Sequence, residues 1–291
     1  MSPLSLALLV LVPAAPAVRP AEPRLLYVSG DEGDRHIFSI KVDGTGAEQL
    51  TTGKGNHLFP AASPDGKRIA FSKDEGGQHQ LYVMDADGKN PKQLTKSGGP
   101  ARGPAWSPDG TKIAYTRFNG NGWCVAVRQV GPPGPVRVDD GNGYDADPTW
   151  SPDGKRIAFT STRSGGGGFR LFAMDPDGKN LKELTAADNP NGFVYPAWSP
   201  DGKRIAYAHP AGAGLEIFVV DADGSNGQQL TKEGGQNSYA AWSKDGKRLA
   251  FVHFDGAKSG LKLMDADGTN VKEVVELPKT VAEGGRTCWR P

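Results

Sequence analysis

One short string recurs through almost the whole chain. Full copies of Pro-Ala/Thr-Trp-Ser-Pro-Asp-Gly and their drifted relatives begin at Pro60, Pro104, Pro148, Pro196 and Ala240, and a last partial copy begins at Thr287. The tryptophan position, an alanine in the first copy, falls at 62, 106, 150, 198, 242 and 289. Successive copies therefore lie 44, 44, 48, 44 and 47 residues apart. Repeats of this length indicate a propeller or a solenoid.

Each copy is predicted to form four short strands. In the copy that begins at Pro196, apolar runs at 196–199, 203–208, 215–220 and 228–231 are separated by Gly, Pro and Asp. The Asp-Gly pairs suit two-residue hairpins, because glycine adopts positive φ without steric cost. No window after residue 17 has a sustained helical period, which argues against a helical solenoid. We therefore predict an all-β propeller of four-stranded blades.

The two ends of the repeat region complement each other. Residues 24–51 contain a second, a third and a fourth strand without a first, and residues 287–291 supply a first strand with none to follow. Together they would form one composite blade, beside the blades that start near 60, 104, 148, 196 and 240. We therefore predict a six-bladed β-propeller over residues 18–291, closed by pairing the C-terminal strand with the N-terminal strands. Closure removes the open edge of the sheet.

The first 17 residues are expected to be a signal peptide. Leu4 to Val12 is an apolar run, and an Ala-x-Ala cleavage site follows at Ala15 and Ala17, although no Lys or Arg precedes the run. The run is too short to span a bilayer, which takes about 20 residues. Cleavage near Ala17 predicts export to the periplasm or out of the cell. A misplaced start or a weakly ordered leader is the alternative.

The repeat carries a family likeness. Trp-Ser-Pro-Asp-Gly-Lys-Arg-Ile-Ala, followed by an Asp-x-Asp-Gly turn and by Leu-Thr, resembles the TolB-type, WD40-like propeller repeat over about residues 24–291. TolB-type proteins carry a separate α/β domain ahead of the propeller, and this sequence lacks it, so we expect a free-standing propeller. Similar repeats also form the propellers of prolyl-oligopeptidase-like peptidases and of oligogalacturonate lyases. The resemblance therefore implies the fold and leaves binding and enzymatic roles open.

The charge balance and the cysteines narrow the class of protein. The net charge is +1, from 34 basic and 33 acidic residues, which argues against a nucleic-acid partner. Apart from the leader, no segment is apolar enough to span a membrane. We also expect the protein to be a monomer. Cys124 and Cys288 are assigned to blades two steps apart, whereas a disulfide needs Cα atoms within about 7 Å. We predict two free thiols.

The loops that differ between copies are the expected binding surface. The Asp-Gly turns lie on one rim of the propeller, here called the bottom rim, and the variable loops lie on the opposite, top rim. Rigid strands that carry variable loops commonly hold binding sites. Residues just before each first strand are predicted to ring the mouth of the central channel: His57, Phe59, Arg102, Asp145, Asp147, Tyr195, Tyr239 and Arg286. Their charges and aromatic rings suit a polar or saccharide-like ligand or a peptide end, and ordinary solvation of the mouth is the alternative.

No metal, cofactor or catalytic motif is predicted. The Asp-x-Asp-Gly strings at Asp85, Asp175, Asp221 and Asp265 begin like calcium loops. They lack the distal bidentate Glu of an EF-hand, and Asx turns explain the aspartates. His209 and His253 take the same place in adjacent blades, on the order of 10 Å apart by sheet spacing, too far to share one zinc at about 2.1 Å. Neither a Gly-x-Ser-x-Gly elbow nor a P-loop is present.

These features favour an exported, non-enzymatic binding or scaffold module of the cell envelope. Its partner would be an envelope or extracellular protein, or a polar small molecule or saccharide, held by the top-rim loops and the channel mouth. The alternative is a carbohydrate-active hydrolase or lyase with a pocket on the top rim. A third hypothesis is a chain that only stabilises a partner encoded elsewhere.

Overall fold

The computed structural model describes residues 22–74, 76–96, 99–131, 137–138, 143–165, 168–185, 195–277 and 287–290. These residues form strands, turns and connecting loops, which confirms the all-β prediction. Within these ranges, no helix of the length and apolarity needed to cross a membrane is found. The predicted signal peptide and Arg286 lie outside the described residues.

The strands follow the repeat. The N-terminal group is β1 (Arg24–Asp31), β2 (Asp34–Lys41) and β3 (Glu48–Gln49). The next two groups are β4 (His57–Ala62), β5 (Arg68–Asp74), β6 (His79–Asp85) and β7 (Lys92–Gln93), then β8 (Ala101–Trp106), β9 (Lys112–Phe118), β10 (Trp123–Gln129) and β11 (Arg137–Val138). They are followed by β12 (Asp145–Trp150), β13 (Ile157–Ser161), β14 (Arg170–Met174) and β15 (Lys182–Glu183). The remaining strands are β16 (Ala197–Trp198), β17 (Arg204–Ala211), β18 (Gly214–Asp221), β19 (Gln228–Gln229), β20 (Gln236–Trp242), β21 (Arg248–Phe254), β22 (Ser259–Asp265), β23 (Lys272–Leu277) and β24 (Cys288–Arg290).

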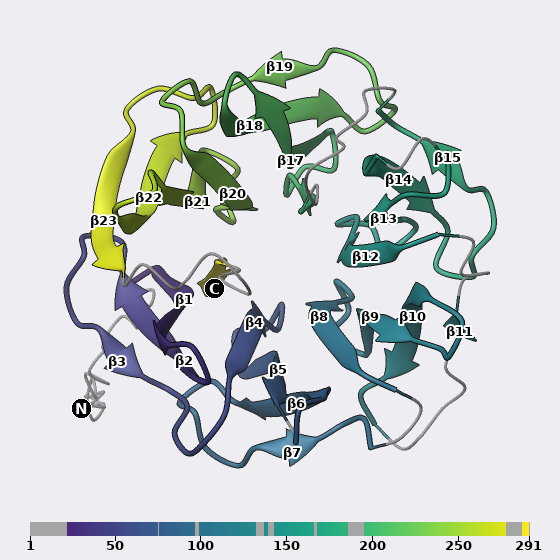
Figure 1. Ribbon diagram of the computed structural model, residues 1–291, viewed down its shortest axis with the longest axis vertical. Helices are drawn as coiled ribbons and strands as arrows, with labels where there is room; N and C mark the ends of the chain where they lie inside the picture. The colour runs from purple at the N-terminus through teal and green to yellow at the C-terminus, as the bar shows by residue number, and fades with distance from the viewer. Residues whose placement is uncertain are drawn as a thin grey trace, which may run out of the picture.

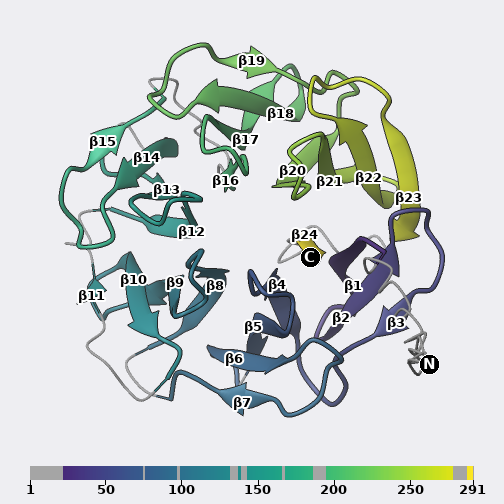
Figure 2. The ribbon, with the colours of Figure 1, turned by 180° about the vertical axis from the view of Figure 1, so that it is seen from behind.

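Neighbouring strands within each group pair antiparallel in chain order. The C-terminal strand β24 pairs with β1, with Leu25 opposite Trp289, so the first and last segments share one sheet in the order β24-β1-β2-β3. A parallel bridge between Leu215 and Gln236 joins the last two groups into one extended sheet. Figures 1 and 2 show the sheets side by side around a central axis, with β4, β8, β12 and β20 near the centre and β7, β15 and β23 at the outside.

The repeated Ser-Pro-Asp-Gly string builds the inner hairpin by local hydrogen bonds. The Ser63 hydroxyl donates to Asp65 (2.6 Å) and accepts from the Arg68 N–H (2.9 Å), and Asp65 also accepts from the Lys67 N–H (3.1 Å). Gly66 has φ +69° and closes a turn onto the Ser63 carbonyl. The hairpin loop is therefore residues 63–67, longer than the two-residue hairpin expected, because Asp-Gly forms only the second half of the turn.

At four positions the tryptophan bonds its sheet to the one before it, namely Trp106, Trp150, Trp242 and Trp289. The Trp106 indole N–H donates to the Ala61 carbonyl of the preceding sheet (3.0 Å), and Trp289 donates in the same way to Ala241 (2.9 Å). The Arg68 guanidinium of the preceding sheet lies over the Trp106 ring, 4.5 Å from its centroid. We call this pair of contacts the tryptophan bridge. The string Trp-Ser-Pro-Asp-Gly-Lys-Arg thus specifies the packing of one sheet on the next.

The second Asp-Gly turn also meets the preceding sheet. A Cβ on Gly88 would overlap the carbonyl oxygen of Leu50, so only glycine allows this approach. Gly44 approaches β23 in the same manner, where a Cβ would lie 2.5 Å from the Val274 oxygen. The turn after β2, near the beginning of the chain, therefore packs directly on the last full group of strands.

The apolar core is divided into clusters between neighbouring sheets. One cluster unites Leu26 and Phe71 with Tyr239, and another unites Leu25 with Leu261 and Leu277. Both clusters join the N-terminal sheet to strands from the C-terminal part of the chain. Neither Cys124 nor Cys288 takes part in a disulfide in the structure.

Candidate functional site at the channel mouth

One backbone position is left-handed in every sheet where it is described. It lies three residues before the tryptophan position and is occupied by Phe59, Gly103, Asp147, Tyr195 and Tyr239, with φ between +46° and +62°. The strand register shifts at this point in β4, β8, β12 and β20. Left-handed backbone costs a non-glycine residue roughly 1–2 kcal/mol, so the surrounding bulge must impose it. We call these five residues the left-handed ring.

Side chains of the left-handed ring contact one another. The rings of Tyr195 and Tyr239 lie 4.0 Å apart between centroids, and both pack in the same apolar cluster as Phe59. Asp147 is buried beside Gly103, where a Cβ would lie 3.6 Å from the carboxylate oxygen. Burial, followed by the neighbouring Tyr239 and Asp147, raises the pKa of Tyr195 above its ordinary value. The Tyr195 hydroxyl therefore stays protonated next to the Asp147 side chain.

A second group of side chains surrounds Arg102 beside the ring. The Arg102 guanidinium lies 4.5 Å from the centroid of the Trp123 ring and donates to the Tyr144 hydroxyl. Trp123 contacts both Phe118 and Tyr144, and Tyr144 contacts Phe169. These four aromatic side chains are half-buried. We call these five residues the Arg102 cluster. It combines hydrogen-bond donors with aromatic faces, a combination that favours recognition at interfaces.

Five of the predicted mouth residues are buried: Phe59, Asp147 and Tyr239 of the left-handed ring, and also His57 and Asp145. His57 and Asp145 stand five residues before the tryptophan position and are only 3% and 0% exposed. Asp145 accepts from the Arg163 guanidinium (2.7 Å) and from the Ser161 hydroxyl. His57 stacks on His36 of the neighbouring sheet, with centroids 5.1 Å apart. Burial, together with the charge of His36, lowers the pKa of His57 to about 4, so the ring is neutral at physiological pH.

The position of His57 and Asp145 is taken by Asn237 in a third sheet. Asn237 donates to the buried carboxylate of Glu216 (2.8 Å) and accepts from Nδ1 of His253 (2.8 Å). His209, at the place equivalent to His253, instead donates from Nδ1 to the Pro210 carbonyl (2.8 Å). Among the described residues, no three His, Cys, Asp or Glu side chains are placed to hold a metal ion.

The aspartates of the bottom-rim turns accept hydrogen bonds from residues of the same turn. Asp85 accepts from the Asn90 side chain (2.7 Å), and Asp87 accepts from the Lys89 N–H (3.0 Å). The same asparagine contact recurs at Asn180, Asn226 and Asn270. These bonds agree with the Asx-turn interpretation of the Asp-x-Asp-Gly strings.

Sequence reasoning named Arg102 and four residues of the left-handed ring, all but Gly103, as mouth residues, but it did not foresee the left-handed backbone or the aromatic residues around Arg102. Trp123 begins a third strand, whereas Tyr144 and Phe169 come from two separate loops. Nothing in the repeat aligns these positions. The available signal was the occurrence of large aromatic residues within variable loops, where a solvated surface does not need them.

The sequence and the fold now define the class of protein. The TolB beta propeller domain matches residues 79–281, so the chain belongs to that family. No curated protein sequence matches the chain significantly.

Solved structures share the fold. TolB from Acinetobacter baumannii has a TM-score of 0.77 at 24% identity, over 92% of this chain and 66% of that chain. A structure described as TolB from Agrobacterium tumefaciens has a TM-score of 0.73 at 20% identity, over 92% of this chain and 98% of that one. A chain of a nidogen/laminin complex has a TM-score of 0.70 at 14% identity, over 92% of this chain and 98% of that chain. The chain thus spans 66% of the Acinetobacter TolB chain. At these identities the likeness concerns the fold alone.

Proposed function

We propose that this chain is an exported, non-enzymatic binding or scaffold module of the cell envelope. Its ligand site is the channel mouth on the top rim, formed by the left-handed ring and the Arg102 cluster. The observation that carries the proposal is the left-handed backbone at Phe59, Asp147, Tyr195 and Tyr239. Gly103 shows that glycine, which is not strained by positive φ, can occupy the same position. Backbone strain of this kind is concentrated at functional sites, including ligand-binding sites.

The proposal includes a ring of six blades closed by β24. Four contacts support it: β24 pairs with β1, Trp289 bonds to Ala241, Gly44 packs on Val274, and Leu25 packs with Leu261. The apolar leader and membership of the TolB beta propeller family support a location in the periplasm or outside the cell.

The side chains at the mouth indicate the chemistry of the ligand. Arg102 offers donors to a carboxylate or a hydroxyl group, and Trp123 offers an apolar face beside it. The protonated hydroxyl of Tyr195 and the carboxylate of Asp147 add a donor and an acceptor. A protein segment or a polar ligand with one apolar edge satisfies this arrangement.

Capture from an envelope extract tests the proposal. The mature chain is immobilised, and bound proteins are identified by mass spectrometry. We expect one envelope protein to be enriched, and the double variant Arg102→Gln, Trp123→Ala to lose it while keeping its melting temperature. The matched control is Lys89→Gln, an exposed change on the bottom rim that should keep full capture.

Two outcomes would contradict the proposal. Equal capture by the double variant would exclude the Arg102 cluster as the site. Turnover of an acidic oligosaccharide that is lost on His57→Ala or Arg286→Ala would instead support the hydrolase or lyase hypothesis.

A further inference from the structure

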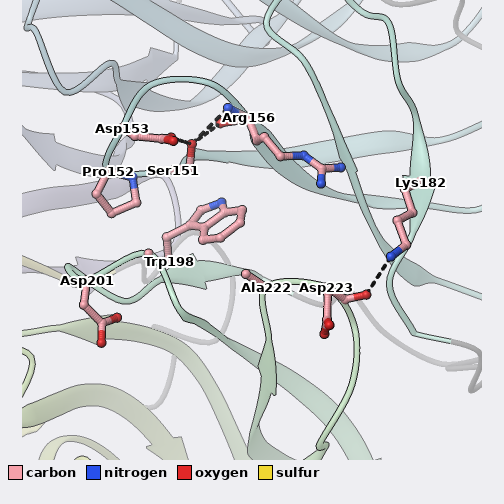
Figure 3. Close-up of a pocket in the computed structure, with 10 residues that line it drawn as sticks. Ser151, Pro152, Asp153, Arg156, Lys182, Trp198, Asp201, Ala222 and Asp223 are labelled. Carbon is pink, nitrogen blue, oxygen red and sulfur yellow. Dashed lines mark hydrogen bonds between the residues drawn. The ribbon is translucent and has the colours of Figure 1, made fainter.

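A cavity opens on the bottom rim, on the side opposite the channel mouth. It has a volume of about 600 Å³ and lies between the turn at 151–153 and the turns at 201–202 and 222–223, with Trp198 among its lining side chains (Figure 3). This volume is within the range of small-ligand sites, about 300–1,000 Å³. We call it the Trp198 pocket.

The Trp198 pocket occurs where the tryptophan bridge is incomplete. At three other boundaries a guanidinium of the preceding sheet covers the indole ring, at 4.5 Å for Arg68 on Trp106, 4.9 Å for Arg204 on Trp242 and 5.2 Å for Arg248 on Trp289. A lysine, Lys112, takes the arginine's place before Trp150. The boundaries at Trp106, Trp242 and Trp289 show that the groove beside the tryptophan accepts a guanidinium.

Arg156 is the residue that should cover Trp198, and it is turned away. Its guanidinium donates to the Ala173 carbonyl (3.2 Å), and no cation lies over Trp198 among the residues that the structure describes. The indole N–H of Trp198 also has no hydrogen-bond partner, whereas Trp106 and Trp242 donate to the preceding sheet. The face of Trp198 is therefore left for another group.

The charges around the pocket favour a cation. Asp153, Asp201 and Asp223 line it. Hydrogen bonds from neighbouring Ser side chains, with backbone N–H groups, lower the pKa of all three carboxyls, which remain ionised at neutral pH. The two cations of the lining already have acceptors, because Lys182 donates to the Asp223 carbonyl (2.9 Å) and Arg156 to Ala173.

We propose that the Trp198 pocket binds the guanidinium group of an arginine side chain presented by a partner protein. The guanidinium would stack on Trp198 in the place that Arg68, Arg204 and Arg248 take at their own boundaries, with the pocket carboxylates as hydrogen-bond acceptors. This site is independent of the proposed function at the channel mouth, so either can fail alone.

Indole N–H signals in a ¹H–¹⁵N spectrum test the proposal on the full chain. The Trp198 signal is assigned by its loss in Trp198→Phe, and the chain is titrated with N-acetyl-arginine amide. We expect a saturable shift of the Trp198 signal and no shift for Trp106, the matched control whose ring Arg68 covers. The neutral isostere N-acetyl-citrulline amide should bind at least tenfold more weakly, and Asp223→Asn should weaken arginine binding several-fold.

Further arms separate the sources of the guanidinium. A Gly-Arg-Gly peptide that binds more tightly than free arginine supports a protein partner, and the reverse order contradicts it. The proposal is also overturned if the Trp198 signal does not move, if citrulline moves it equally, or if binding occurs only after Arg156→Gln. The last result would mean that Arg156 fills the site itself in solution.

Discussion

At the residue scale, left-handed backbone occurs at two kinds of non-glycine position. On the bottom rim it is taken by Asn90 and its equivalents, and asparagine tolerates this region well. Around the channel it is taken by Asp147 and by Phe59, Tyr195 and Tyr239, three bulky residues that tolerate it poorly. Backbone strain is therefore concentrated at the channel, where we place the binding site.

Another residue-scale consequence concerns His57 and pH. The pKa of His57 is about 4 in the folded chain, against 6.5 ordinarily, so between these values the unfolded chain binds a proton that the folded chain does not. Its contribution to stability is complete above pH 6.5 and is lost as the pH falls toward 4. His57→Gln should therefore lose less stability than the wild type over this window, by on the order of 2 kcal/mol.

Urea unfolding at pH 7, 5.5 and 4.5 measures this difference. His79 and His253 also have lowered pKa values, mainly through burial, so the wild-type decline is shared among several groups. Lys89→Gln should retain the wild-type dependence. A His57→Gln variant with an unchanged pH dependence would show that the buried ring does not resist protonation.

At the element scale, strands were predictable from sequence and the bulge was not. The run at 203–208 and the strand Arg204–Ala211 overlap because apolar alternation and turn residues specify both. The bulge position holds Phe, Gly, Asp or Tyr, so no residue type marks it. One extra residue reverses the direction of the side chains beyond it. Of the residues expected at the mouth, His57, Phe59, Asp145, Asp147 and Tyr239 are buried, whereas Arg102 and Tyr195 are half-buried.

Two glycines with left-handed backbone, one in a bottom-rim turn and one in the loop between β1 and β2, give an element-scale prediction. Gly88 and Gly33 have nearly identical φ, +87° and +88°, but a Cβ on Gly33 has nothing within 4 Å whereas one on Gly88 overlaps the Leu50 carbonyl. Gly33→Ala should cost about 1 kcal/mol from backbone strain alone. Gly88→Ala should cost about 3 kcal/mol or more, because the neighbouring sheet must also move. If urea unfolding gave the two variants equal losses of unfolding free energy, the close approach between sheets would contribute nothing to stability.

At the scale of the whole molecule, the fold could be predicted because most boundaries between sheets repeat the same contacts. The serine and the aspartate bond to each other within the turn in five copies, and the tryptophan of four copies bonds to the adjacent sheet. The sites could not be predicted in the same way. The Arg102 cluster combines the ends of β8, β9 and β10 with Tyr144 and Phe169, at positions where the copies differ. The Trp198 pocket depends on the direction of Arg156, whose residue type matches the repeat.

Closure of the ring is the central claim, because both proposed sites need neighbouring sheets held in place. Removal of residues 287–291 deletes Trp289, its bond to Ala241 and the partner of β1. Loss of one such tryptophan costs about 3–5 kcal/mol, and each kcal/mol lowers the melting temperature of a chain this large by about 2–4 °C.

Differential scanning calorimetry of the full chain and of a chain ending at residue 286 is the most direct test. Trp289→Phe serves as the intermediate variant, since it keeps β24 and loses only the indole contacts. We predict that the truncated chain melts at least about 10 °C below the full chain or fails to fold. A truncated chain that melts at the temperature of the full chain would contradict closure by the C-terminal strand.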